Sequence, residues 1–191
     1  MEQIESVLAF WFGKPDRAEC GKSRKVWFAK DPEFDEAVRS RCSSLYRQAA
    51  IGELEDWTAT PAGCLALIIL LDQVPRNLFR NSPQAFATDS QALSVAESAV
   101  DRGFDRELLP VQRWFIYLPF EHSESLEHQE RCLALFSHLE DDPESASAID
   151  YARRHYKVIQ RFGRFPHRNA ILGRESTPEE AEFLTQAGSS F

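Results

Sequence analysis

The side chains best suited to chemistry lie in three short stretches, each built around a proline. The stretches are LDQVPRNLFR (71–80), LPFEHSE (118–124) and RFGRFPHRN (161–169). In each one, acidic, amide, imidazole or guanidinium groups follow directly after apolar residues. A proline cannot donate to the carbonyl four residues back, so a helix ends or kinks there and a new one can begin. The stretches therefore predict polar junctions at the ends of buried helices, where free N–H groups favour an anion.

The number of guanidinium groups in these stretches favours a pocket for an anion. Arginine binds carboxylate and phosphate groups bidentately and also stacks on aromatic rings. We therefore predict a binding module for an anionic small molecule or the carboxylate of a peptide end. The predicted ligand-binding residues are Asp72, Gln73, Arg76, Arg80, Glu121, His122, Arg161, Arg164, His167, Arg168 and Asn169.

Two other interpretations of the same residues stay open. The first is a hydrolase-type enzyme, in which an imidazole works with a neighbouring carboxylate as an acid–base pair. Its candidate catalytic residues are His122, Glu121, Glu124, His167 and Asp72. The second is a purely structural network, in which every arginine of the three stretches pairs with a carboxylate or carbonyl inside the fold. The sequence leaves open whether any reaction is catalysed.

Other known kinds of site leave no trace in the sequence. It contains no HExxH pair, GxSxG turn or phosphate-binding glycine loop, and the four cysteines do not have zinc spacing. We therefore expect no metal and no cofactor. The longest apolar run, LALIILL (65–71), is too short to span a bilayer, and the N-terminus does not resemble a signal peptide. A cytoplasmic protein is the expectation.

Charge is distributed unevenly along the chain. The net charge is -8, which argues against nucleic acid or an anionic membrane as a partner. Residues 151–174 nevertheless hold seven of the 22 basic residues and no acidic one, which leaves 15 basic against 30 acidic residues elsewhere. This segment either is neutralised inside the fold or faces an anion. The sequence does not indicate the oligomeric state.

Apolar residues recur at helical spacing, which predicts a single all-α domain over residues 1–191. Asp31, Thr60, Asp142 and Thr177 each precede a proline and suit helix starts, and Thr88 and Thr177 suit capping boxes with Gln91 and Glu180. A short turn is expected at 24–28. The predicted helices are 2–12, 32–51, 61–73, 75–80, 89–102, 110–118, 125–139, 145–162, 168–173 and 178–187.

Five motifs together resemble a known family. They are LAFWFG (8–13), LDQVPRNLFR (71–80), AFATD (85–89), LPFEHSE (118–124) and RFGRFPHRNAILGRESTPEE (161–180), and they resemble the bacterial family called domain of unknown function 924. The resemblance implies an all-helical fold similar to the tetratricopeptide-like superfamily. The three prolines, spaced by 44 and 47 residues, also suit the antiparallel helix pairs of an α-solenoid. The resemblance implies no activity and no catalytic residues.

Overall fold

The computed structural model describes residues 1–14 and 21–189, and all regular structure within them is helical. The prediction of an all-α fold is confirmed. The α-helices are α1 (Glu2–Phe12), α2 (Pro32–Ala50), α3 (Pro61–Ile68), α4 (Val74–Leu78), α5 (Asp89–Asp101), α6 (Pro110–Glu121), α7 (Leu126–Ser137), α8 (Ala146–Phe162) and α9 (Pro178–Leu184). A π-helical turn, Ile69–Gln73, joins α3 to α4. Short 3-10 turns lie at Lys25–Trp27, Glu55–Ala59, Pro83–Phe86, Phe104–Glu107, Pro143–Ser145 and Pro166–Arg168.

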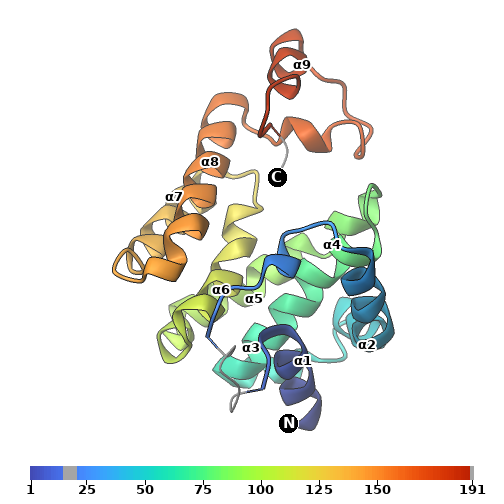
Figure 1. The fold of residues 1–191 in the computed structure, drawn as a ribbon, viewed down its shortest axis with the longest axis vertical. Coiled ribbons are helices and arrows are strands. Elements are labelled where there is room, and N and C mark those ends of the chain that lie inside the picture. The colour runs from blue at the N-terminus through green and yellow to red at the C-terminus, as the bar shows by residue number, and fades with distance from the viewer. Residues whose placement is uncertain (15–20, 190–191) are drawn as a thin grey trace.

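Helices that are one or two places apart in the chain pack against one another. α5 packs against α3 and α6, α6 against α7, and α7 against α8, while α1 lies on α3 and α2 on α4. Figure 1 shows α7 and α8 at one flank and α2 at the other, with the segment that carries α9 across one end of the molecule. No helix in the described ranges is both long enough and apolar enough to cross a membrane.

The core lies around α3 and α6. Cys64 to Ile68 are all buried, so α3 is apolar on every side, as a central helix must be. Trp11, Phe12 and Trp27 pack edge-on around Phe115 of α6, with ring centres 5.0 to 5.9 Å from it. Aromatic residues therefore join the N-terminal segments to the central helices.

Side-chain caps start several helices as predicted. Asp31 accepts from the backbone N–H groups of Glu33 and Phe34, and Thr60 accepts from that of Gly63. Thr177 forms a capping box with Glu180. These caps satisfy N–H groups that have no partner within the helix.

Three other predictions about helix ends are wrong. Asp142 precedes Pro143 but makes no side-chain cap bond. Thr88 makes no cap bond to α5, because its hydroxyl donates to the Leu71 carbonyl instead. The helix predicted to stop at 118 continues to Glu121 with Pro119 inside it. Pro119 and its neighbours are buried on all sides, so packing outweighs the cost of about 3 kcal/mol for an internal proline.

The helix predicted at 168–173 is also absent. Pro166–Arg168 forms a 3-10 turn, and residues 169–173 continue as further turns. The chain reverses at Gly173, whose φ of +67° is a left-handed conformation that suits glycine. Arg174 then bonds back through its N–H to the carbonyl of Asn169.

Candidate functional site

The π-helical turn places a carboxylate inside the protein. Pro75 has no N–H to give to the carbonyl of Leu71, and the hydroxyl of Thr88 donates to that carbonyl instead. The turn therefore lies between α3 and α4 with its backbone satisfied, and Asp72 within it is fully buried. π-helical turns are rare in proteins overall, but they occur often at functional sites. Asp72 therefore marks the centre of the candidate site.

Asp72 contacts His122, which lies at the end of α6. Nδ1 of His122 is 2.7 Å from Oδ1 of Asp72, and the Gln73 amide donates to Oδ2 at 2.6 Å. Burial alone would raise the pKa of Asp72, but the charge and hydrogen bond of His122, with the charge of Arg76, hold that pKa below its ordinary value. Asp72 is therefore an ionised acceptor.

An ionised Asp72 determines which nitrogen of His122 is open. Nδ1 donates its hydrogen to the carboxylate. Nε2 then carries the lone pair of the neutral ring, or the second proton of the charged ring. Among the residues that the structure describes, no hydrogen bond reaches Nε2, and the side chain keeps 16% of its exposure. His122 can therefore exchange a proton with a bound molecule.

A buried amide holds the end of α6 in place. Gln129 of α7 is fully buried, and its side-chain NH₂ donates to the carbonyls of Phe120, Glu121 and Ser123, at 3.3, 2.6 and 2.8 Å. The last carbonyls of a helix have no partner within the helix, so this amide replaces the missing donors. The backbone that carries His122 is thereby tied to α7.

Two arginines lie next to this pair, on the ring of Phe86. The guanidinium carbons of Arg76 and Arg168 are 4.5 and 4.8 Å from the ring centre. Arg76 pairs with Asp89 at 2.8 Å, whereas Arg168 is 3.9 Å from Asp89 and donates to the carbonyl of His122 at 3.0 Å. Burial, together with the charge of Arg76, lowers the pKa of Arg168 to about 10. It remains a cation at neutral pH.

A second carboxyl–imidazole pair lies behind the first. Oε1 of Glu121 is 3.0 Å from Nδ1 of His155 in α8, and the rings of His122 and His155 are 6.4 Å apart. Burial, reinforced by the charge of Asp72, raises the pKa of Glu121 to about 8. Burial lowers the pKa of His155 to about 3. At neutral pH the carboxyl group of Glu121 is therefore protonated and the imidazole of His155 is neutral.

Comparison with known proteins identifies relatives of the whole chain. Residues 7–188 match the family described as "Bacterial protein of unknown function (DUF924)". The chain belongs to this family. A solved structure of a protein of unknown function from Agrobacterium tumefaciens is 38% identical, with a TM-score of 0.84, over 96% of this chain and 97% of that one. No curated protein matches the sequence.

Several predicted site residues of this DUF924 chain lie away from His122. Arg80 bonds the carboxylate of Asp35 with two nitrogens, at 2.6 and 2.7 Å, and Asn77 donates to the same group. Glu124 accepts two bonds from Arg174 and one from the backbone N–H of Phe165. These contacts tie α2 to α4, and the end of α6 to the C-terminal segment.

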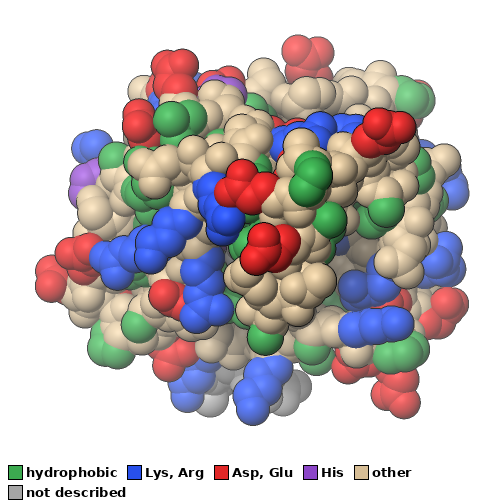
Figure 2. Space-filling model, turned by 90° about the horizontal axis from the view of Figure 1, so that it is seen from above, with side chains coloured by type: hydrophobic (Ala, Val, Ile, Leu, Met, Phe, Trp, Pro, Cys, Tyr) green, Lys and Arg blue, Asp and Glu red, His purple; other side chains and the backbone are tan. Residues whose placement is uncertain are grey.

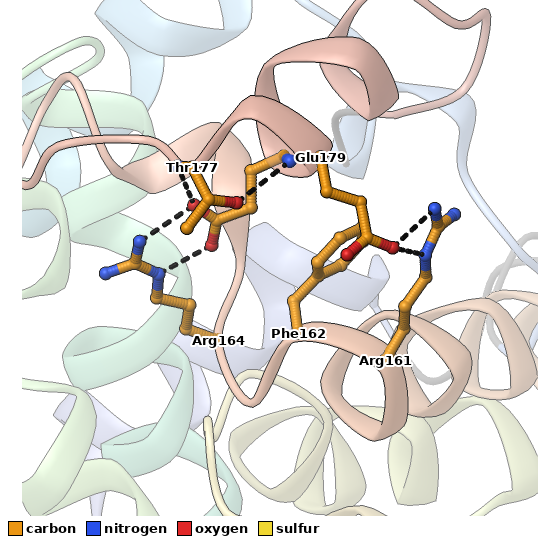
Figure 3. Close-up of a pocket in the computed structure, with 6 residues that line it drawn as sticks. Arg161, Phe162, Arg164, Thr177 and Glu179 are labelled. Atoms are coloured by element: carbon orange, nitrogen blue, oxygen red, sulfur yellow. Dashed lines mark hydrogen bonds and ion pairs between the residues drawn. The ribbon is translucent and has the colours of Figure 1, made fainter.

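The arginines before Pro166 line a separate hollow of about 410 Å³ (Figure 3). Arg161 pairs with Glu179 at 2.8 Å, and Arg164 bonds both oxygens of Glu180, at 2.6 and 2.7 Å. The Asn169 amide also donates to Glu180. Both guanidinium groups of the hollow therefore already have carboxylate partners.

Most arginines of the basic segment 151–174 have a close acidic partner within the fold. Its arginines meet acidic residues from other parts of the chain or from one helical turn back, and Figure 2 shows acidic and basic side chains interspersed over one face. The ion pairs are Arg153–Glu140, Arg154–Asp150, Arg161–Glu179, Arg164–Glu180, Arg168–Asp89 and Arg174–Glu124. Of these, the Arg168 contact is the longest, at 3.9 Å.

His167 lies beside Arg168. Burial and the neighbouring guanidinium lower the pKa of His167 to about 4, so its imidazole is neutral at ordinary pH. The structure gives the role of an aspartate-bound imidazole to His122, and of the predicted set it gathers Asp72, Gln73, Arg76, Glu121, His122 and Arg168 in one place. No group of histidine, cysteine and acidic side chains in the described ranges could hold a metal ion.

The sequence interpretation missed two residues of the site. His155 is three residues after buried Ala152 and four before buried Ile159, and Gln129 is three before buried Cys132. Both are polar residues on an otherwise apolar helical stripe. A buried polar side chain needs a hydrogen-bonding partner, so that position in the stripe was the available signal.

Proposed function

We propose that the chain binds an anionic small molecule, through a carboxylate or phosphate group, at the opening beside His122. The observation that carries the proposal is the hydrogen bonding of Arg168. Its side chain is buried, yet in the described part of the chain it makes one hydrogen bond, to the carbonyl of His122. Its Nε is buried without an acceptor. A guanidinium group has five donors, and each buried donor left unpaired costs about 1–3 kcal/mol.

The ion pairs of the two arginines also favour one anionic group. Arg76 lies 2.8 Å from Asp89 and 4.0 Å from Asp72, whereas Arg168 lies 3.9 Å from Asp89. Asp89 is thus shared between two guanidinium groups and lies closer to Arg76, so the positive charge of Arg168 is only weakly balanced, in surroundings where little water screens it. An anion bound by Arg168 and Nε2 of His122 balances that charge, and the ring of Phe86 supports the guanidinium plane.

The proposed site is smaller than the set of residues predicted from sequence. Arg80, Arg161 and Arg164 already share carboxylates, so they act in the proposal as links between helices. The ligand is then a compact anion or the terminal carboxylate of a peptide, because of the two arginines on the Phe86 ring Arg168 alone has no acidic partner closer than 3.9 Å in the described part of the chain.

A thermal-shift and calorimetric comparison tests the proposal. The ligands are sulfate, succinate and a short peptide with a free C-terminal carboxylate, and the same peptide as its amide separates a peptide end from a free anion. We expect an anion to raise the unfolding midpoint of the wild type and of Arg161→Gln, whose exposed arginine lies in the separate hollow. Arg168→Gln should lose that response. An equal response in Arg168→Gln, or none in the wild type, contradicts the proposal.

A second candidate function is hydrolysis with His122 as general base. The pairing of buried Asp72 with Nδ1 favours it, since a carboxylate in that position orients an imidazole and stabilises it after it takes a proton. In this reaction Nε2 accepts a proton from water while the water oxygen attacks the ester of an anionic substrate, and the proton then passes to the leaving alcohol. Nitrophenyl esters and phosphates provide the assay. His122→Gln and Asp72→Asn should each abolish turnover, and turnover that survives both excludes this role.

A further inference from the structure

We infer that Glu121 keeps a proton in the folded protein and thereby regulates the anion site proposed above, on which this regulation depends. Glu121 is adjacent in sequence to His122, yet its side chain points to a different partner, His155 of α8. It is therefore an ionisable group beside the site that does not itself bind the anion.

The surroundings of Glu121 do not suit an ionised carboxylate. The residue is 3% exposed, and no donor within the described residues reaches its Oε2. Its Oε1 faces Nδ1 of His155, but that nitrogen is also 2.9 Å from the carbonyl of Tyr151. A carbonyl can only accept, so the single N–H is divided between two acceptors. A buried negative charge with so few donors is far more costly than a neutral carboxyl group.

The charged and titratable groups around Glu121 come from three neighbouring elements. They are Asp72 of the π-helical turn, the thiol of Cys132 in α7 and His155 in α8, in addition to adjacent His122. His167 and Arg168 of the 3-10 turn Pro166–Arg168 act on His155. Asp72 is ionised and disfavours a second negative charge. Arg168 is the cation of the set, and its one hydrogen bond is made to the backbone of His122.

The proton on Glu121 therefore keeps a second negative charge away from His122. With Glu121 neutral, the ionised carboxylate beside His122 is Asp72. When Glu121 ionises, a further negative charge lies one residue from His122 and repels an anion held by Nε2 of His122 and by Arg168. Anion affinity should then fall as pH rises through the range in which Glu121 ionises.

Sulfate binding measured by calorimetry between pH 6 and pH 9.5 tests the inference, because the charge of sulfate is constant over this range. The three proteins are the wild type, Glu121→Gln, which resembles a permanently protonated carboxyl group, and Glu130→Gln, the same change on the exposed side of α7. We expect the wild type and Glu130→Gln to lose about tenfold more affinity than Glu121→Gln above pH 8. Identical pH profiles for all three proteins overturn the inference.

A second measurement needs neither a ligand nor a variant. The side-chain carboxyl carbon of Glu121, observed by NMR in the ligand-free wild type, should titrate above pH 7. Titration near pH 4.5 overturns the inference even if sulfate binds. If sulfate does not bind at all, the proposed function and its regulation fail together, while this titration still decides whether Glu121 holds a proton.

Discussion

Replacing Glu121 by glutamine should stabilise the protein, and increasingly so as pH rises. Glutamine has nearly the shape of the glutamic acid side chain but no proton to lose. In the wild type, Oε1 of the buried, protonated carboxyl group lies 3.0 Å from Nδ1 of the neutral His155. The variant removes the tendency of this group to ionise inside the protein, so its effect isolates the cost of burying that acid.

The size of the effect follows from the two pKa values of Glu121. The pKa is 4.5 when the group is in water and about 8 in the folded protein. Below pH 4.5 both folded and unfolded chains hold the proton, so its stabilising contribution is complete. Between pH 4.5 and 8 only the folded chain holds it, and stability falls by about 1.4 kcal/mol for each pH unit. The wild type therefore loses up to about 5 kcal/mol by pH 8 and little more above it.

Urea unfolding at pH 5, 7 and 9 measures this difference directly. The free energy of unfolding of Glu121→Gln relative to the wild type should increase from pH 5 to pH 9. That of Glu130→Gln, whose side chain is exposed, should not change relative to the wild type. The pKa of His155 is lowered to about 3, so this group reduces stability as pH falls below about 6.5. Its effect at pH 5 is common to the wild type and both variants, so the difference between the proteins removes it. Parallel pH dependences for the wild type and Glu121→Gln would refute the reasoning.

Three further substitutions test the elements that position the site, and urea unfolding measures each one. Thr88→Val removes the donor to the Leu71 carbonyl and should destabilise by about 1–3 kcal/mol, with Thr88→Ser retaining most of the stability. Gly63→Ala places a Cβ against the Trp57 carbonyl oxygen, which is backbone and cannot move aside, and should cost about 1–3 kcal/mol. Gln129→Leu removes the amide that donates to the carbonyls of Phe120, Glu121 and Ser123 and should cost at least about 2 kcal/mol.

The helices were predictable because local rules and burial agree. Asp31 and Thr60 cap as their types suggest, and each stands before a proline that suits the first helical position. Local rules failed where a distant partner competed. Thr88 satisfies the carbonyl that Pro75 leaves free, seventeen residues away, so it cannot also cap α5. Pro119 stays inside α6 because burial on every side outweighs its local cost.

The candidate site was predictable in its residue types and only partly in its grouping. Asp72, His122 and Arg168 were expected together because each lies within three residues of the proline in one of the three stretches. The partners of Arg80 and Arg164 were not predictable, since Asp35 and Glu180 lie outside the three proline-centred stretches and pairing depends on which helices are neighbours. Spacing along a chain reports neighbours within a helix, whereas these ion pairs cross between helices.

A ligand-binding site differs from a purely structural network in one respect. It has a polar atom whose hydrogen bonding is not satisfied within the fold. Arg80 and Arg164 each use two nitrogens on a single carboxylate, so their role is complete within the fold. The imidazole of His122 is different: a fully buried carboxylate holds one nitrogen, and the other is left open at a partly exposed position. Burying Asp72 to hold one histidine is costly if the only result is a link between helices, because an apolar pair could do the same. This cost is explained if Nε2 of His122 and the incompletely bonded Arg168 bind a ligand.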